Sequence, residues 1–338
     1  MTMRYLVTGC AGFIGAHVSR RLLHDGHLVT GVDDLNDGYD PRLKQWRLDQ
    51  LQSLPGFRFH RSDIADPKAI EEVFAADAGV GAIAGPRSPY AAVINLAARA
   101  GIRASAEDPR SYYRTNVDGV LALLELCRTY GVPKFLLASS SSVYGAAEQV
   151  PYREDADTNH PLSPYAATKK AAETLAYSYH HLYGIDVAVL RYFTVYGPAG
   201  RPDMSVFYFI RRIAEGEPVV VFGDGTQRRD FTYVDDVAAG TVAALRPSGY
   251  EIINLGDSHP VALLELIEEI SRQLGKAAQI ERRAANPMEV ATTWADIDKA
   301  RRLLGWSPQI ALDEGIRRSI AWYGENRRWV LSLKMGAR

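Results

Sequence analysis

Short apolar runs alternate with longer amphipathic stretches through the first half of the chain, and two stretches have a clear helical period, Val117–Tyr130 and Tyr165–Tyr183. This alternation predicts βαβ units, and runs rich in Val, Ile and Leu suit the strands of a parallel sheet covered on both faces. The predicted fold class is therefore α/β, with a doubly wound parallel sheet. The predicted strands are Tyr5–Val7, Leu28–Val32, Phe57–Phe59, Val93–Leu96, Phe135–Ala138 and Val187–Leu190.

The pattern changes after Arg191, where turn-forming residues at Tyr196–Pro202 predict a loop and shorter elements follow. We predict that residues 1–195 form a first domain, to which residues 234–257 return. Residues 196–233 and 258–338 are expected to form a smaller mixed α/β lobe. The stretch Gly79–Pro89, rich in Gly, Ala and Pro, predicts a surface loop. Helices are expected at Val206–Glu215, Val234–Leu245, Leu263–Leu274 and Glu314–Tyr323, and strands at Val219–Phe222 and Ile252–Leu255.

The chain has 338 residues, a formal net charge of −1 and two cysteines, Cys10 and Cys127. A near-neutral chain gives no electrostatic reason to expect binding to nucleic acid or to an anionic membrane surface. Two cysteines form neither a disulfide framework nor a metal-binding spacing, so no metal site is expected. The sequence has no signal-peptide pattern and no apolar stretch long enough to span a membrane, which favours a cytoplasmic location.

Three glycines, Gly9, Gly12 and Gly15, follow the first predicted strand and begin a helical pattern. In a strand–turn–helix, such glycines allow a tight turn, approach of the backbone to a pyrophosphate, and close packing of the helix on the strand. The second strand is followed by Asp33, about 20 residues further on, where an acid binds the adenosine ribose and repels a 2′-phosphate. The pattern therefore predicts a Rossmann-type site for NAD, and Asp34 could share the role of Asp33.

Tyr165 and Lys169 are four residues apart and lie on one face of a predicted helix. A nearby ammonium and a helix N-terminus both favour the phenolate of a tyrosine, so Tyr165 is a candidate base for a sugar hydroxyl while NAD accepts a hydride. Four serines, Ser139–Ser142, follow the strand Phe135–Ala138, at the end of a parallel strand where ligands bind. Ser140 or Ser142 could hydrogen-bond the reacting hydroxyl. Taken alone, each of these two patterns also fits an ordinary solvated helix face or a polar turn.

Together these motifs resemble the extended short-chain dehydrogenase/reductase family, over nearly the whole chain. Further segments that carry the resemblance are Asn95-Leu-Ala-Ala98, Asn116, Ser139-Ser-Ser-Ser-Val-Tyr-Gly145 and Arg191-Tyr-Phe-Thr-Val-Tyr-Gly197. The family implies that Tyr165 is the catalytic base, that Lys169 also holds the nicotinamide ribose, and that Ser140 is a catalytic partner. Besides the glycines, Asp33, Tyr165 and Lys169, it implies cofactor contacts at Phe13, Ile14, Asn36, Asp63, Ile64, Leu96, Ala97, Ala98, Asn116, Ser139, Tyr192 and Phe193.

Three segments, Asp33–Leu43, Ala98–Arg103 and Thr194–Met204, are similar to the UDP-glucuronate 4-epimerases of this family. The resemblance implies epimerisation of UDP-glucuronic acid to UDP-galacturonic acid through a transient 4-keto sugar, with NAD tightly bound and regenerated in each cycle. A 4-keto uronic acid is a β-keto acid and loses CO2 easily, so the enzyme should grip its carboxylate. A guanidinium offers planar, bidentate contacts for this grip, and Arg201 is the candidate. The expected substrate contacts are Ser140, Ser141, Ser142, Tyr165, Thr194, Arg201, Ser205, Val220 and Arg229, the last at the diphosphate.

Other functions remain open at this point. A 4-epimerase of UDP-glucose or UDP-galactose would use the same redox residues. A UDP-glucuronate decarboxylase is less favoured, because serines (Ser141 and Ser142) stand where the resemblance places acids in dehydratases and decarboxylases. A non-catalytic NAD(H)-binding protein would be expected to have lost Tyr165 or Lys169, and both are present. The segment Asn286-Pro-Met-Glu-Val290 departs from the Gln-Pro-Gly-Asp-Val that the epimerases usually show. By resemblance, Val117–Tyr130 and Tyr165–Tyr183 would pair across a homodimer as a four-helix bundle.

Overall fold

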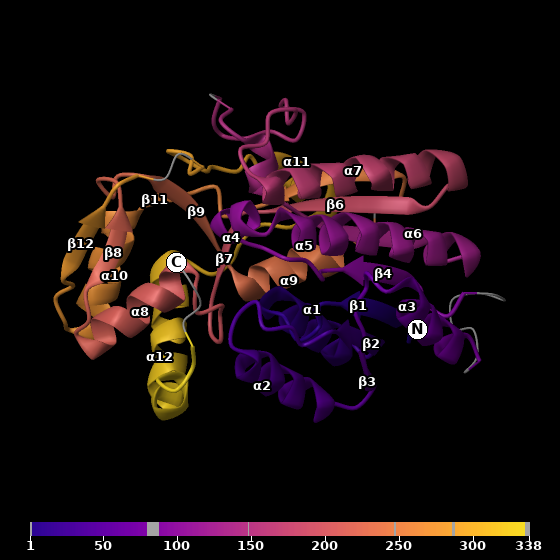
Figure 1. Cartoon of the computed structure of the whole chain (residues 1–338), viewed down its shortest axis with the longest axis horizontal. Coiled ribbons are helices and arrows are strands. Elements are labelled where there is room, and N and C mark those ends of the chain that lie inside the picture. Colours follow the sequence, from indigo (N-terminus) through magenta and orange to yellow (C-terminus); the bar gives the residue numbers. More distant parts are fainter. Residues whose placement is uncertain (1, 80–87, 148, 247, 286–287, 335–338) are drawn as a thin grey trace.

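A seven-stranded parallel sheet is the centre of the computed structural model, which describes residues 2–79, 88–147, 149–246, 248–285 and 288–334 (Figure 1). Alternate residues of its buried strands point to opposite faces, and both faces carry apolar side chains. In spatial order the strands are β10 (Tyr250–Leu255), β6 (Asp186–Tyr192), β5 (Lys134–Ser140), β4 (Ala92–Asn95), β1 (Arg4–Thr8), β2 (Leu28–Asp33) and β3 (Phe57–Arg61).

The strand order reverses at β1, with β2 and β3 on one side and β4 on the other. In a doubly wound sheet, ligands bind at the carboxyl ends of the strands beside such a reversal. The glycine turn after β1, Asp33 at the end of β2, and the serines at the end of β5 all lie at this edge. The sheet topology therefore brings the sequence motifs together, although they are far apart in the chain.

Helices cover both faces of the sheet (Figure 1). Buried apolar side chains join one face to α1 (Phe13–His24), α9 (Val234–Ala243) and α11 (Asp298–Leu304). The opposite face packs against α3 (Pro67–Ala78), α6 (Gly119–Thr129) and α7 (Pro164–Tyr183). The other helical elements in the first half of the chain are α2 (Pro41–Gln52), α4 (Ile102–Glu107), α5 (Pro109–Tyr113), a π-helix at Arg114–Asp118 and a 3-10 turn at Ser141–Tyr144.

A third apolar core lies in the smaller lobe, and Tyr39 and Leu43 reach into it from the beginning of α2. Its helices are α8 (Ser205–Glu215), α10 (Leu263–Leu274) and α12 (Leu312–Val330). Its strands form a three-stranded sheet in the order β11 (Pro260–Ala262), β9 (Arg228–Tyr233), β7 (Thr194–Tyr196), and a pair of β12 (Ile280–Arg283) with β8 (Val219–Phe222). No helix in the described part of the chain combines the length and the apolar character that a membrane crossing requires.

The predicted fold class is confirmed, whereas several boundaries differ and some elements were not predicted, among them α2, α3, α11, β9 and β12. Leu96 lies outside β4, because the chain turns there beside Gly9. The helix predicted at Val117–Tyr130 begins instead as the π-helix Arg114–Asp118, where the side chain of Asn116 bonds outside the helix. Tyr196 ends β7 and is not part of the loop that follows. The predicted loop Gly79–Pro89 falls mostly outside the described residues.

A buried ion pair fixes α7 to the sheet. Arg191 on β6 and Glu173 on α7 are each 1% exposed, and Arg191 Nη2 and Nε donate to the two Glu173 carboxylate oxygens at 2.8 and 3.0 Å. Ser139 Oγ, at the end of β5, donates to the same carboxylate at 2.6 Å. One carboxylate therefore joins two neighbouring strands to the helix that carries Tyr165 and Lys169.

We predict that Glu173→Ala lowers the free energy of unfolding by about 3–5 kcal/mol, because it leaves the Arg191 guanidinium buried without a counter-ion. Urea denaturation of the variant and the wild type measures the difference. The control is Asp155→Ala, which removes an ion pair with Arg153 whose side chains are 71% and 68% exposed, and which should change stability little. Equal stability of Glu173→Ala and wild type would contradict the role of this pair.

Candidate functional site

The turn between β1 and α1 requires glycine at two positions, because a side chain at either position would collide with backbone atoms. Gly9 has φ of +68°, and a Cβ on it would lie 2.7 Å from the backbone nitrogen of Ala97. A Cβ on Gly15 would overlap the carbonyl oxygen of Gly9, so α1 packs directly on the turn. Gly12 is the N-cap of α1, and no side chain caps this end of the helix. The first turn of α1 therefore offers backbone N–H groups and a positive dipole end to a diphosphate.

Asp33 is fixed beside this turn and is 5% exposed. Its carboxylate accepts hydrogen bonds from the backbone N–H groups of Ala11, at 3.1 Å, and Leu35, at 2.9 Å. The ammonium of Lys44 on α2 lies 3.4 Å from it. Asn36 donates to the neighbouring Asp34 and so shapes the same turn. The glycines and Asp33 thus fit the diphosphate and adenosine ribose of NAD.

Ser140, Tyr165 and Lys169 meet at the carboxyl end of β5. Lys169 is buried, its Nζ donates to the carbonyl oxygen of Ala138 at 2.8 Å, and it lies 5.9 Å from the centre of the Tyr165 ring. Burial lowers the pKa of Lys169 to about 8, and the charge of Glu173 opposes this shift. Ser140 Oγ lies 3.1 Å from Ser142 Oγ and accepts from the backbone N–H of Ser142. Ser139 is turned away, toward Glu173.

The pKa of Tyr165 shifts in the direction opposite to the one that the sequence suggested. Burial raises it above its ordinary value, and a hydrogen bond with Ser140 and the charge of Arg201 offset part of the rise. The charge of Lys169 and the helix N-terminus can be foreseen from the sequence, whereas the burial of Tyr165 depends on how distant segments pack. In the protein without ligands, Tyr165 is therefore a neutral phenol at neutral pH.

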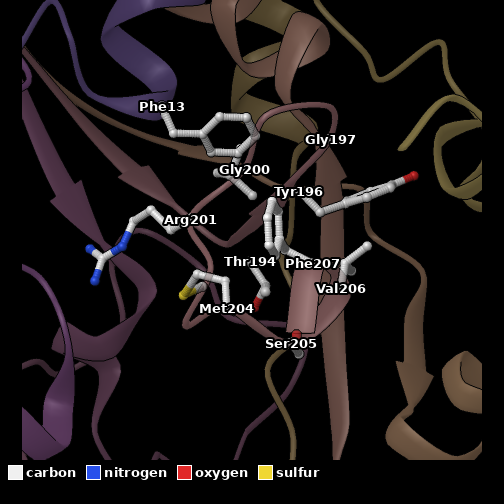
Figure 2. Close-up of a pocket in the computed structure, with 11 residues that line it drawn as sticks. Phe13, Thr194, Tyr196, Gly197, Gly200, Arg201, Met204, Ser205, Val206 and Phe207 are labelled. Atoms are coloured by element: carbon white, nitrogen blue, oxygen red, sulfur yellow. The ribbon is translucent and has the colours of Figure 1, made fainter. Parts of the chain in front are cut away.

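Arg201 lies on the turn after β7, and its guanidinium extends away from Thr194, Met204 and Ser205, which line the same pocket (Figure 2). Its Nε and Nη2 donate to the carboxylate of Asp203 at 3.1 and 2.6 Å, and Nη2 also reaches the carbonyl oxygen of Ala100 at 3.4 Å. Phe13, Thr194, Arg201 and Ser205 line one small pocket. The structure therefore brings three of the predicted substrate residues to the first turn of α1.

Arg229 and Val220 lie in the lobe, on β9 and β8. Arg229 faces Glu289, with 3.8 Å between Nη2 and the carboxylate, and Glu289 also forms an ion pair with Arg103 of α4. Glu289 belongs to the segment that departs from the pattern of the epimerases; residues 286 and 287 of that segment lie outside the described residues. The pair Arg103–Glu289 connects α4 to the lobe next to the predicted diphosphate ligand.

Several predicted cofactor residues have structural partners. The side chain of Asn116 accepts a hydrogen bond from the backbone N–H of Arg99, and it donates to the carbonyl oxygen of Arg99 and to the hydroxyl of Thr168. It therefore connects the segment after β4 to α7. The hydroxyl of Tyr192 lies 2.9 Å from Thr241 Oγ1, and therefore points into the protein toward α9. Asp63 forms an ion pair with Arg114. The side chains of Ile64 and Phe193 are buried. The backbone N–H of Ala97, between Leu96 and Ala98, donates a hydrogen bond to Thr8 Oγ1. Whether these residues contact NAD stays a prediction.

Sequence reasoning missed three residues that surround the site, namely Tyr39, Lys44 and Arg47. Lys44 and Arg47 follow the segment Asp33–Leu43 at a helical spacing of three, which is the only signal that the sequence offers for them. In the part of the chain that the structure describes, no group of three or more His, Cys, Asp or Glu side chains is arranged to hold a metal ion.

Comparison with known proteins identifies the family. The model of the NAD dependent epimerase/dehydratase family matches residues 5–256. A UDP-glucuronate 4-epimerase of Thermodesulfobacterium geofontis (strain OPF15) is 51% identical over 332 residues, which is 98% of this chain and 99% of that relative. The chain belongs to the NAD-dependent epimerase/dehydratase family, and the resemblance that its motifs suggested is confirmed.

Two solved structures are similar over almost their whole length. The Bacillus cereus UDP-glucuronic acid 4-epimerase in complex with UDP-glucuronic acid and NAD has a TM-score of 0.86 and 36% identity, covering 96% of this chain and 99% of that one. The Thermotoga maritima UDP-glucose 4-epimerase with UDP-glucose has a TM-score of 0.87 and 31% identity, covering 96% and 100%. Fold similarity alone therefore does not separate a uronic acid from a neutral sugar.

We predict that Tyr165 ionises above a pH of about 10 when NAD has been removed, because burial disfavours the charged form. The difference in phenolate absorbance between wild type and Tyr165→Phe, followed against pH, isolates this hydroxyl from the other tyrosines. In Ser140→Ala the transition should move to higher pH, since a hydrogen bond that lowers the pKa is lost. A Tyr165 phenolate that forms near neutral pH in the cofactor-free protein would contradict this reading.

Proposed function

We propose that this protein catalyses the NAD-dependent 4-epimerisation of UDP-glucuronic acid to UDP-galacturonic acid. The observation that carries the proposal is the convergence of two chemistries at one site. Tyr165, whose hydroxyl is close enough to Ser140 for that side chain to lower its pKa, supplies a group for proton transfer, and Arg201, whose charge also lowers the pKa of Tyr165, supplies a guanidinium for a carboxylate. The relative from Thermodesulfobacterium geofontis and the ligand complex from Bacillus cereus support the same substrate.

In this mechanism Tyr165 accepts the proton of the C4 hydroxyl, and Ser140 hydrogen-bonds the same oxygen while it becomes a ketone. Bound NAD would supply the acceptor for the C4 hydride and the donor from which the same hydride returns to the other face of the sugar. Tyr165 then gives the proton back, so that the configuration at C4 is inverted without net oxidation. The buried Lys169, held on the carbonyl oxygen of Ala138, is placed to bind the nicotinamide ribose and to favour the phenolate once the substrate arrives.

The carboxylate of the 4-keto intermediate has to be prevented from leaving as CO2. Loss of CO2 requires the bond to the carboxylate to align with the π system of the ketone, and a charged hydrogen bond from the Arg201 guanidinium would hold it out of alignment. Ser142 and Thr194 are proposed to assist. Asp203 already binds Arg201 through Nε and Nη2, so the remaining nitrogen, Nη1, is the one that we assign to the substrate.

The neutral-sugar 4-epimerase is the second candidate, because the Thermotoga maritima structure is as similar in fold. Arg201 favours the uronic acid, since its guanidinium, on a side chain that is 21% exposed, would meet no anionic group on the sugar ring of UDP-glucose or UDP-galactose. A decarboxylase is less supported, because Ser141 and Ser142 offer no acid. A non-catalytic role is less supported because Tyr165, Lys169 and Ser140 are assembled at the site.

The division of the chain into two parts is also a proposal. We assign residues 1–195 and 234–257 to the NAD-binding domain and residues 196–233 and 258–338 to the nucleotide-sugar lobe. Support comes from β10, which extends the parallel sheet beside β6, and from the separate apolar core of α8, α10 and α12. The exception is α11, which packs against the parallel sheet.

We further propose a cytoplasmic location, for which the support is that both cysteines are free and buried.

A homodimer through α6 and α7 is proposed as the assembly. The two helices pack side by side (Figure 1), and large apolar side chains on them are exposed: Leu121 by 40%, Tyr177 by 51%, Leu182 by 64% and Tyr183 by 49%. A second copy of the same two helices would cover these side chains by forming a four-helix bundle.

We predict that purified protein with its bound NAD converts UDP-glucuronic acid to UDP-galacturonic acid without added cofactor and without forming UDP-pentose. Chromatographic separation of the nucleotide sugars measures the products. A UDP-pentose product would instead indicate a decarboxylase. Absence of conversion, even with added NAD, would shift the function to a neutral sugar or to a non-catalytic role.

In the same assay, Arg201→Ala should raise KM for UDP-glucuronic acid about ten- to a hundredfold, as expected for the loss of a hydrogen bond to a charged group, and UDP-pentose should appear. The matched control is Arg302→Ala, which removes an exposed arginine of α11. An unchanged KM and an unchanged product in Arg201→Ala would rule out Arg201 as the carboxylate ligand.

The double variant Leu121→Glu, Leu182→Glu is expected to be a monomer, because four buried carboxylates would have to enter the bundle. Light scattering coupled to size-exclusion chromatography gives the mass, and Arg302→Glu, on a helix outside α6 and α7, should leave it unchanged. A wild-type protein that is monomeric, or a double variant that keeps the dimer mass, would contradict this assembly.

A further inference from the structure

Arg47 on α2 is a buried cation to which neither the sequence motifs nor the mechanism above assigns a task. Its side chain is among the largest that are fully buried, and it is 1% exposed. Nη1 donates to the carbonyl oxygen of Ala11 at 3.2 Å and to the hydroxyl of Tyr39 at 2.6 Å. Nε and Nη2 donate to the carbonyl oxygen of Ala199 at 3.0 and 2.6 Å, and Nη2 reaches that of Gly200 at 3.4 Å.

All these acceptors are neutral oxygens. Within the described residues, Arg47 forms no ion pair with an acidic side chain, whereas its neighbour Lys44 is paired with Asp33 and Asp34. A buried guanidinium without a counter-ion is costly, since hydrogen bonds to neutral groups replace only part of its hydration. The arrangement therefore has an unbalanced positive charge that an anion would stabilise.

The place of that charge indicates which anion. Ala11 lies inside the glycine turn, and the Arg47 guanidinium carbon is 5.8 Å from the centre of the ring of Phe13, the first residue of α1. The positive end of the α1 dipole points to the same place. Arg47 thus binds the backbone of the turn next to the N–H groups that would hold a diphosphate, and places a full positive charge beside them.

The other end of the same guanidinium holds the segment that carries Arg201. Ala199 has φ of +54°, a left-handed conformation that is unfavourable for alanine and needs support from its surroundings. Two N–H groups of Arg47 bind its carbonyl oxygen. Phe13 contributes a second contact, because its ring lies against Gly200 (Figure 2), and a Cβ on Gly200 would be 3.8 Å from it.

Tyr39 completes the connection between the two arginines. The guanidinium carbons of Arg47 and Arg201 each lie 5.5 Å from the centre of the Tyr39 ring, and the Lys44 ammonium lies 5.6 Å from it. The electron-rich face of a tyrosine attracts such cations. The position of Arg201 therefore depends on α2 through Tyr39 and on Arg47 through the Ala199–Gly200 turn.

We propose that Arg47 is a positioning residue for both ligands of this enzyme. Its charge acts through the glycine turn as a counter-ion for the diphosphate of NAD. Its hydrogen bonds to Ala199 and Gly200 hold Arg201 toward the carboxylate of the sugar. The second statement rests on the proposed function; the first does not.

The experiment compares Arg47→Lys, which keeps the charge but cannot make the same set of hydrogen bonds, with Arg47→Met, which keeps most of the volume and removes the charge. The measurements are the Kd of NAD for protein from which the bound cofactor has been removed, KM for UDP-glucuronic acid, the Kd of UDP-glucose, and the proportion of UDP-pentose formed. The matched control is Arg4→Met, because Arg4 is also buried but pairs with Asp77, away from both turns.

Arg47→Lys is expected to bind NAD within a few-fold of wild type, but to show a KM for UDP-glucuronic acid about tenfold higher and some UDP-pentose. Arg47→Met is expected to lose at least tenfold in NAD affinity as well. Neither variant should change the Kd of UDP-glucose by a similar factor, and Arg4→Met should alter only the thermal stability. These differences separate positioning from a loss of folding, which would affect every quantity together.

Wild-type NAD affinity in Arg47→Met, or an equal loss in Arg47→Lys and Arg47→Met, overturns the counter-ion role. An unchanged KM for UDP-glucuronic acid in Arg47→Lys, with no UDP-pentose, overturns the positioning of Arg201, and this holds even where Arg47→Met does not fold. If the wild type itself does not accept UDP-glucuronic acid, the proposed function fails, whereas the NAD measurements still decide the counter-ion role.

Discussion

The carbonyl oxygen of Gly9 occupies the space that a side chain on Gly15 would need, and the backbone of Ala97 occupies the space next to Gly9 itself. This close packing of backbone on backbone brings the end of β1, the first turn of α1 and the segment after β4 into contact. Because β1 lies where the strand order reverses, the same contact sets the position of the crevice between β1 and β4. The register of the parallel strands then sets the positions of Asp33 and of the serines of β5 at the same edge of the sheet.

Charged groups in this protein are buried in two different ways. Arg191 and Glu173 neutralise each other, and their role is to hold α7 against β5 and β6. Arg47 is held by neutral oxygens, and its charge remains available to a ligand. Arg201 is intermediate, since Asp203 binds two of its nitrogens. The three arginines thus differ in how far protein groups neutralise their charge, and this difference is the basis for assigning Arg191 to structure and for proposing Arg47 and Arg201 for ligand binding.

The sequence predicted the α/β class, the buried strands, and the motifs that meet at the carboxyl edge of the sheet, because these depend on local periodicity and on glycine spacing. It did not predict the burial that raises the pKa of Tyr165, nor that the hydroxyl of Tyr192 faces Thr241, since both depend on packing between distant segments. Arg47 could not be recognised either. Its partners Ala11 and Ala199 contribute only carbonyl oxygens, and a sequence gives no sign of which carbonyls a side chain will reach.

The central claim is that one site removes a hydride and a proton from C4 of UDP-glucuronic acid and returns both to the same carbon. The most direct test is the reaction of UDP-glucuronic acid deuterated at C4 in ordinary water, with the product examined by mass spectrometry and NMR. The account predicts UDP-galacturonic acid that keeps the deuterium at C4, because the hydride never leaves the site. Loss of the deuterium from C4, with inversion still occurring, would contradict it.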